Sequence, residues 1–218
     1  MKPARAAARF LLLLLLPVSI FLPFCAARAQ APDLSKPLLL VARPTLQGPY
    51  SHTAVLAVPL GNKHIGFILN RSTETKLSAA FPDHLPSAKV VEPIYFGGPE
   101  AADALFALKR GNPGAPSLQL FGDVYMTGSS KVIDRIIETT PNDARYFAGF
   151  VGWMPNELAV EIARGFWYVG EVDSAEVFRK DAGEALWEEL AKRLGHGAKP
   201  PRRPGDKEAA IPASPRRL

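Results

Sequence analysis

The chain has 218 residues, of which 47% are hydrophobic and 22% charged, and its formal net charge at pH 7 is +5. This length is typical of one domain with short extensions. The charge is unevenly distributed, because residues 1–29 hold four basic residues and no acid, and residues 195–218 hold six basic and two acidic residues. Residues 30–194 hold 16 basic and 19 acidic residues, a net charge of −3. Because nucleic-acid-binding domains carry a basic patch on the folded body, this composition argues against nucleic acid as a partner.

The N-terminus has the pattern of a secretory signal peptide over residues 1–29. A basic start with Lys2, Arg5 and Arg9 precedes an apolar run over residues 10–24. The small-x-small sequence that ends at Ala29 predicts cleavage after that residue, which places the mature protein in the periplasm or outside the cell. The alternative is an uncleaved membrane anchor, but the apolar run of about fifteen residues is shorter than the roughly 20 that span a bilayer. We therefore expect no stable membrane span after cleavage.

Cys25, the only cysteine, lies within this predicted signal peptide. Its removal on cleavage would leave no disulfide, thiol nucleophile or thiolate metal ligand in the mature protein. At the other end, residues 195–218 are rich in proline and arginine and poor in large apolar residues. That composition is typical of a disordered, solvated tail. The predicted domain therefore covers residues 30–194.

Apolar patterns and turn residues within this domain predict many short strands and a few helices. Taken in chain order, we predict a strand at 37–43, a hairpin of strands at 53–60 and 64–70, a short helix at 76–81, strands at 92–99 and 104–110, two short strands within 118–128, a helix at 131–140, a strand at 145–153, a helix at 155–164, a strand at 166–170 and a closing helix at 183–194.

Helix boundaries follow from residues that favour helix ends. Ser129 or Ser130 can cap the helix at 131–140, Pro155 is expected at the first position of the next helix, and Gly165 ends it. Strands outnumber helices, and the regular strand–helix alternation of a parallel sheet is missing. The sequence therefore predicts a single α+β domain.

The sequence contains no established catalytic or metal-binding motif. Its four histidines are not spaced as metal ligands, and the motifs of serine hydrolases, phosphate loops and dinucleotide-binding folds are missing. We therefore predict no metal and no cofactor. The sequence Gly128-Ser129-Ser130-Lys131 could hold an anion at a helix start, but N-capping accounts for it more simply.

Three segments at strand ends carry the candidate ligand-binding residues. An amide and a guanidinium directly after a buried strand could bind a carboxylate or phosphate. A Gly-Gly bend permits close approach of the backbone, and an indole near a helix start could line a cleft. Strand termination, tight packing and helix capping are structural alternatives for all of them. The candidates are Asn70, Arg71, Gly97, Gly98, Trp153, Asn156 and Glu157, and we expect the three segments to meet in space.

Two tryptophans stand close together in the third segment. The indole N–H groups of Trp153 and Trp167 need hydrogen-bond partners if the rings are buried. Gly149 and Gly152 lie around the same strand end, where missing side chains let a neighbouring strand come close. Packing is the first interpretation of this segment, and a cleft is the second.

The ordered segments LLLVARPTL, GFILNRS, IYFGGP, ARYFAGFVGW with NEL, and RGFW resemble the YqgE/AlgH family of bacterial proteins. The resemblance covers residues 36–194. It implies a mixed, curled sheet that forms a small barrel-like core surrounded by helices, and no established enzymatic activity. The family name carries an association with transcriptional control. This chain departs from the family pattern at Ser72, Phe150, Met154, Asn156 and Glu157, within the candidate cleft.

These observations predict an exported, non-catalytic accessory protein of the bacterial envelope that binds a small ligand or an envelope protein. One alternative is a transcriptional regulator, as the family name suggests. The predicted export and the net negative charge of the domain argue against it. The other alternative is an undescribed hydrolase that would use Asn70, Arg71 or Glu157.

Overall fold

The computed structural model describes residues 31–180 and 183–195. The chain divides into two units, residues 1–31 and 32–218, and the fold described below belongs to the second unit. The predicted signal peptide, and the predicted tail beyond Gly195, lie outside the described residues.

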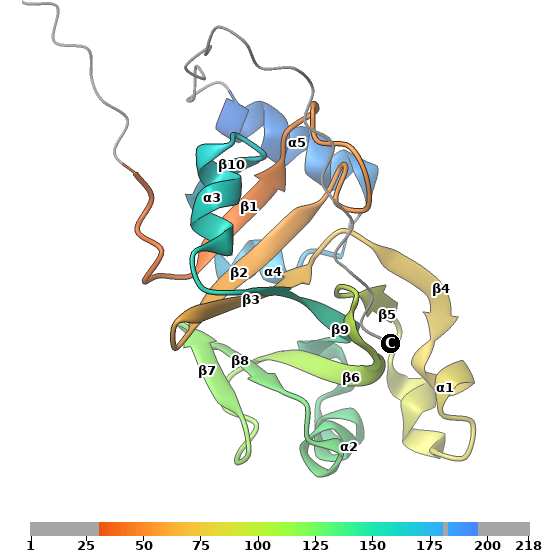
Figure 1. Cartoon of the computed structure of the whole chain (residues 1–218). Helices are drawn as coiled ribbons and strands as arrows, with labels where there is room; N and C mark the ends of the chain where they lie inside the picture. Colours follow the sequence, from red (N-terminus) through yellow and green to blue (C-terminus); the bar gives the residue numbers. More distant parts are fainter. Residues whose placement is uncertain (1–30, 181–182, 196–218) are drawn as a thin grey trace, which may run out of the picture. The chain divides into compact units, whose positions relative to one another are not determined.

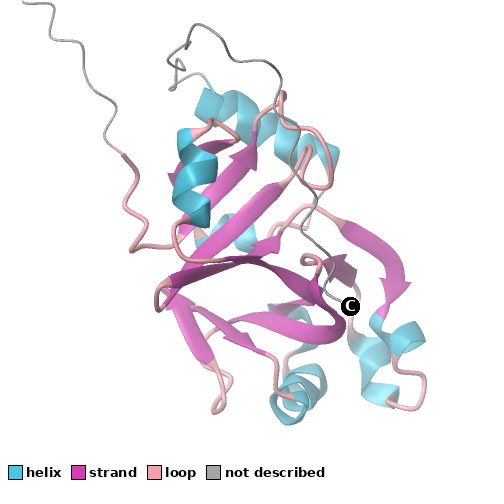
Figure 2. Cartoon of the chain, in the orientation of Figure 1, coloured by secondary structure: helices cyan, strands magenta, loops and turns pink. Residues whose placement is uncertain are grey.

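Ten strands and five α-helices make up the described part of the chain (Figures 1 and 2). The strands are β1 (Leu38–Ala42), β2 (Ala54–Leu60), β3 (Lys63–Ile68), β4 (Ser72–Lys76), β5 (Pro93–Phe96), β6 (Glu100–Arg110), β7 (Leu118–Phe121), β8 (Val124–Thr127), β9 (Ala144–Trp153) and β10 (Trp167–Glu171). The helices are α1 (Leu77–Ala80), α2 (Ser130–Thr139), α3 (Glu157–Ala163), α4 (Ser174–Val177) and α5 (Glu184–Gly195), with 3-10 turns η1 (Leu85–Lys89) and η2 (Pro141–Asp143).

All ten strands join one curled sheet in the order β10-β1-β2-β3-β9-β6-β8-β7, with β5 also on β9 and β4 on β5. Every pairing is antiparallel except that of β5 with β9. The predicted α+β class and the mixed, curled sheet are thus confirmed. Strand β9 is the junction of the sheet, because it pairs with β3 near its end and with both β5 and β6 nearer its start.

The predicted hairpin of residues 53–70 is confirmed as β2 and β3, and its turn uses Gly61 at a φ of 63°. The remaining predicted strands and helices also form, with ends shifted by a few residues. Strand β4 was not predicted, since four of its five side chains are exposed and its sequence is polar. It forms because it pairs with β5 as an outer strand of the sheet. Helix α4 was also missed, and its single turn is capped by the Asp173 carboxylate, which accepts from the N–H of Ala175.

Two predicted helix starts are wrong in detail. Ser129 occupies the N-cap position of α2, but its side chain makes no capping hydrogen bond, and its carbonyl oxygen accepts from Val132 and Ile133 instead. Pro155 lies in the turn before α3 and is not the first helical residue. The N-cap of α3 is Asn156, with a left-handed φ of 67°.

Two apolar cores stabilise the sheet. The larger core packs α5 against β1, β2 and β10 and includes Trp153, Trp167 and Trp187. The smaller core lies under α2, which buries the apolar face predicted from its sequence, Val132, Ile133, Ile136 and Ile137. No helix within the described ranges is both long and apolar enough to cross a bilayer.

Candidate functional site

The three segments singled out in the sequence lie side by side in the structure. Strand β3 pairs with the end of β9, with His64 opposite Trp153. The bend after β5 bridges both strands, because Gly97 donates its N–H to the carbonyl of Ala148 at 2.8 Å and its own carbonyl accepts from Ile68 at 2.9 Å. The carbonyl of Arg71 accepts from the N–H of Phe96 at 2.8 Å. The bend therefore meets both the end of β3 and the middle of β9. Trp153, at the end of β9, lies opposite His64 at the start of β3, so its meeting with Arg71 remains a prediction.

The Gly97-Gly98 bend is a site of close backbone packing. A Cβ on Gly97 would lie 2.2 Å from the carbonyl oxygen of Gly149, and one on Gly98 would lie 2.2 Å from the carbonyl carbon of Phe150. No side chain fits at either position without moving the backbone. This packing accounts for both glycines, and it lets the bend cross β9 where Gly149 takes a φ of 69°.

The Asn70 side chain also has a structural role, and the residue is only 5% exposed. Its Oδ1 accepts from the N–H of Ala54 at 2.8 Å, and its Nδ2 donates to the carbonyls of His52 and Gly183 at 2.9 and 3.1 Å. The Asn70 side chain thereby ties the end of β3 to the β1–β2 loop and to the start of α5. Its part in a ligand site remains a prediction.

Arg71, the next residue, is half-buried and differs in its contacts. Its Nη2 donates to the carbonyl of Ser51 at 3.2 Å. No carboxylate among the described residues lies within 4.0 Å of its guanidinium. Burial lowers the pKa of Arg71, and only the nearby Tyr50 hydroxyl acts in the opposite direction. Most of the hydrogen-bonding capacity of the guanidinium is thus unused within the described structure.

Tyr50 connects Arg71 with the tryptophan segment. Its ring contacts that of Trp167, with centroids 6.3 Å apart. Burial raises the pKa of Tyr50 to about 12, and the carboxylates of Glu161, Glu100 and Glu157 add to this effect, whereas Arg71 opposes it. Acidic groups and one guanidinium therefore lie within electrostatic range of a single phenol.

Glu161 is the partner that the two buried indoles require. Its Oε2 accepts from Nε1 of Trp153 at 2.9 Å and from Nε1 of Trp167 at 2.8 Å. Burial raises the pKa of Glu161, and the two indole hydrogen bonds partly offset this rise. This carboxylate holds α3 against the ends of β9 and β10.

Asn156 and Glu157 shape the turn that leads into α3. Asn156 adopts a left-handed conformation and is exposed. The Glu157 Oε2 accepts from the N–H of Met154 at 2.9 Å, which closes the turn before the helix. Both side chains lie at the surface, and the Asn156 side chain makes no capping hydrogen bond.

No motif in the sequence marked Tyr50, Glu100 or Glu161 as candidate residues. Tyr50 lies in the long β1–β2 loop, far in sequence from every segment it contacts. Glu161 follows Glu157 by one helical turn on the same face of the helix, and this spacing beside two tryptophans could have identified it. Within the described residues there is no group of three metal-ligating side chains.

Fold and site together define a small α+β protein with a curled, mainly antiparallel sheet and a cluster of arginine, tyrosine, glutamate and tryptophan at its strand ends. A family model described as AlgH-like matches residues 39–199, and the chain belongs to this family. The UPF0301 protein of Chlorobium limicola is 30% identical over 166 residues, covering 72% of this chain and 85% of the relative. A UPF0301 protein of Serratia proteamaculans is 28% identical over 168 residues, covering 72% and 89%.

Solved structures agree with the fold. The solution structure of the AlgH protein from Pseudomonas aeruginosa has a TM-score of 0.62 at 23% identity and covers 81% of this chain and 99% of that chain. A crystal structure from Corynebacterium diphtheriae has the same TM-score at 19% identity, covering 75% and 89%. At these identities the likeness establishes the shared fold.

Proposed function

We propose that this AlgH-like chain is an exported, non-catalytic binding protein of the bacterial envelope, and that Arg71 binds an anionic group of its ligand or partner. The observation that carries the proposal is the half-buried guanidinium with a single hydrogen bond to a carbonyl and no carboxylate within 4.0 Å among the described residues. Burial of a charge without a counter-charge is unfavourable. A carboxylate or phosphate would supply the missing counter-charge through paired hydrogen bonds.

The surroundings of Arg71 favour binding over catalysis. Tyr50 acts electrostatically on Arg71, and the raised pKa of Tyr50 keeps its phenol protonated at neutral pH. Glu161 is engaged by two indoles through one oxygen, and Glu157 closes a turn. A protonated phenol and a guanidinium supply hydrogen-bond donors for an anion.

Export is supported by the pattern of residues 1–29. N-terminal sequencing of the protein from a periplasmic extract should begin at Gln30. A full-length protein found only in the cytosol would overturn this part of the proposal. A role in transcription has less support, since residues 30–194 carry a net charge of −3 and its main argument is the association carried by the family name.

Binding is tested by native mass spectrometry of the purified protein, followed by titration with the anion identified. Arg71→Ala should abolish the bound species while leaving the melting temperature nearly unchanged. Arg164→Ala is the matched control, because Arg164 is an exposed arginine at the end of α3. Equal binding by the two variants would contradict the assignment of Arg71.

A further inference from the structure

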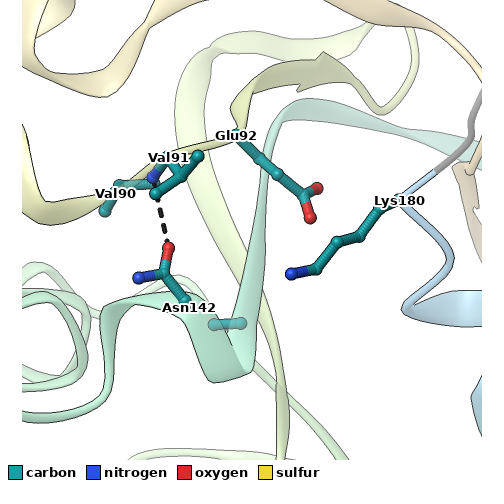
Figure 3. Close-up of a pocket in the computed structure, with 6 residues that line it drawn as sticks. Val90, Val91, Glu92, Asn142 and Lys180 are labelled. Carbon is teal, nitrogen blue, oxygen red and sulfur yellow. Dashed lines mark hydrogen bonds between the residues drawn. The ribbon is translucent and has the colours of Figure 1, made fainter.

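A cavity of about 190 Å³ is lined by none of the residues of the Arg71 site (Figure 3). It lies between the segment that leads into β5, the η2 turn with the start of β9, and Lys180. It is lined by Val90, Val91, Glu92, Asn142, Ala144 and Lys180.

One wall of the cavity is apolar and held in place. Val90 and Ala144 are buried, whereas the Val91 side chain is exposed. Asn142 fixes this wall, because its Oδ1 accepts from the N–H of Val91 at 3.2 Å and its Nδ2 donates to the carbonyl of Lys89 at 3.3 Å. The side-chain amide of Asn142 therefore stabilises the segment at Lys89 and Val91 beside the cavity.

Buried groups inside the fold hold the Glu92 carboxylate in position. Its Oε2 accepts from the Tyr95 hydroxyl at 3.0 Å and lies 3.7 Å from Nε of Arg145. Arg145 is 2% exposed, and its guanidinium lies 3.8 Å from the centre of the Tyr95 ring. Its two Nη atoms donate to the carbonyls of Val177 and Leu69 at 2.6 and 2.8 Å. Burial raises the pKa of Tyr95, so its hydroxyl remains a donor to Glu92.

The other oxygen of Glu92 and the ammonium of Lys180 are both available to a ligand. Within the described residues, Oε1 has no hydrogen-bond partner, and the Glu92 side chain is 23% exposed. Figure 3 shows the Glu92 and Lys180 side chains extending toward one another from opposite sides of the cavity. They make no ion pair at 4.0 Å or less, so a gap separates the two charges.

We propose that this cavity binds a small zwitterion of the α-amino acid class with a short aliphatic side chain. The ligand ammonium donates to Glu92 Oε1, its carboxylate accepts from Lys180 Nζ, and its side chain packs on Val90, Val91 and Ala144. Because Arg145 and Tyr95 already contact Oε2 of Glu92 from within the fold, the carboxylate is held in position when the ligand arrives. An amine without a carboxylate leaves Lys180 unpaired, and a carboxylate without an amine is repelled by Glu92.

The test is a titration of the purified protein with L-valine, followed by the amide NMR signals of Val91, Glu92 and Ala144. These signals should shift in a saturable way, with affinity near the millimolar range that suits a ligand of so few atoms. Isopropylamine and isobutyrate, each with one charge only, should bind at least ~10-fold more weakly, which is about 1.4 kcal/mol. Equal binding by either analogue, or no saturable shift with L-valine, would overturn the proposal.

Two variants locate the site. Glu92→Gln and Lys180→Met should each weaken L-valine binding by ~10-fold or more, and Lys180→Met alters an exposed side chain that the fold does not need. Lys76→Met, at an exposed lysine of β4, is the matched control and should bind as the unaltered protein does. Arg71→Ala should also retain L-valine binding, which separates this site from that of the proposed function. Unchanged affinity in Lys180→Met would remove the lysine from the site and overturn the zwitterion assignment.

Discussion

Trp153 and Trp167 donate their indole N–H groups to the same atom, Oε2 of Glu161, at 2.9 and 2.8 Å. The first tryptophan ends β9 and the second begins β10, and these strands lie in different parts of the sheet order. Glu161 comes from α3, the helix that connects them. One carboxylate therefore fixes the helix to both strands and orders the surface beside Tyr50.

Replacement of Glu161 tests this relationship directly. Glu161→Leu removes the acceptor of two largely buried donors and should lower the free energy of unfolding by about 2–4 kcal/mol. Glu161→Gln should cost no more than about 1 kcal/mol, because an amide oxygen can accept both hydrogen bonds. Urea unfolding of the three proteins measures the difference. Equal losses of stability in the two variants would mean that the shared acceptor is not what holds α3 against β9 and β10.

The raised pKa of Glu161 predicts a dependence of stability on pH. A carboxyl whose pKa is higher in the folded state than in the unfolded state binds its proton more tightly when folded. Its contribution is fully present below the ordinary value of 4.5 and is lost as the pH rises through the raised folded value. The stability of Glu161→Gln relative to the unaltered protein should therefore increase with pH across this window and then level off. Urea titrations at a series of pH values measure it, and a difference that is flat across the window would contradict the raised pKa.

Titration of Tyr50 tests the electrostatic cluster. Its pKa of about 12 is raised by burial and by Glu161, and it is lowered by Arg71. Glu161→Gln should therefore lower this pKa, and Arg71→Met should raise it. The Tyr50 signal is obtained by subtracting the ultraviolet titration of a Tyr50→Phe variant in each background. Shifts in the same direction in both variants would show that these charges do not face Tyr50 as described.

The glycine bend predicts a sharp contrast between neighbouring positions. Gly97→Ala should destabilise the protein by about 3 kcal/mol or more, because its Cβ would meet the Gly149 carbonyl oxygen at 2.2 Å. Gly152→Ala, whose Cβ would lie 3.5 Å from its nearest neighbour, should change stability by only about 0.5 kcal/mol. Thermal or urea unfolding compares the two. A mild Gly97→Ala variant would show that the bend can move away from β9.

Variants of Asn70 and Arg71 should distinguish a structural role from a role in binding. Asn70→Ala leaves a buried N–H and two carbonyls without their partner and should cost about 2–4 kcal/mol. Arg71→Ala removes one hydrogen bond to a carbonyl at 3.2 Å and should cost about 1 kcal/mol or less. Asn62→Ala, in the exposed hairpin turn, serves as a control for the asparagine variant. A large loss of stability in Arg71→Ala would make Arg71 a structural residue and weaken the proposed function.

Much of the fold follows from local patterns in the sequence. Apolar runs and the Gly61 turn predicted the β2–β3 hairpin, and the spacing of Val132, Ile133, Ile136 and Ile137 predicted the buried face of α2. These features depend on residues close in the chain, so period and turn chemistry suffice. Strand β4 depends on pairing with β5, and a polar segment has no local signal for such pairing.

In the candidate site too, some features follow from local sequence patterns and others depend on long-range packing. Local patterns were enough to predict that Arg71, the Gly97-Gly98 bend and Trp153 lie at strand ends, and that two indoles would need partners. The folded chain was needed to show that Asn70 bonds buried backbone groups, and that the bend is packed against β9. It also places Tyr50 and Glu161 beside this site, because the pairing of β1 with β10 and the path of the β1–β2 loop bring them there. Contacts between segments so far apart in the chain depend on the packing of the whole sheet, which no local pattern of residues encodes.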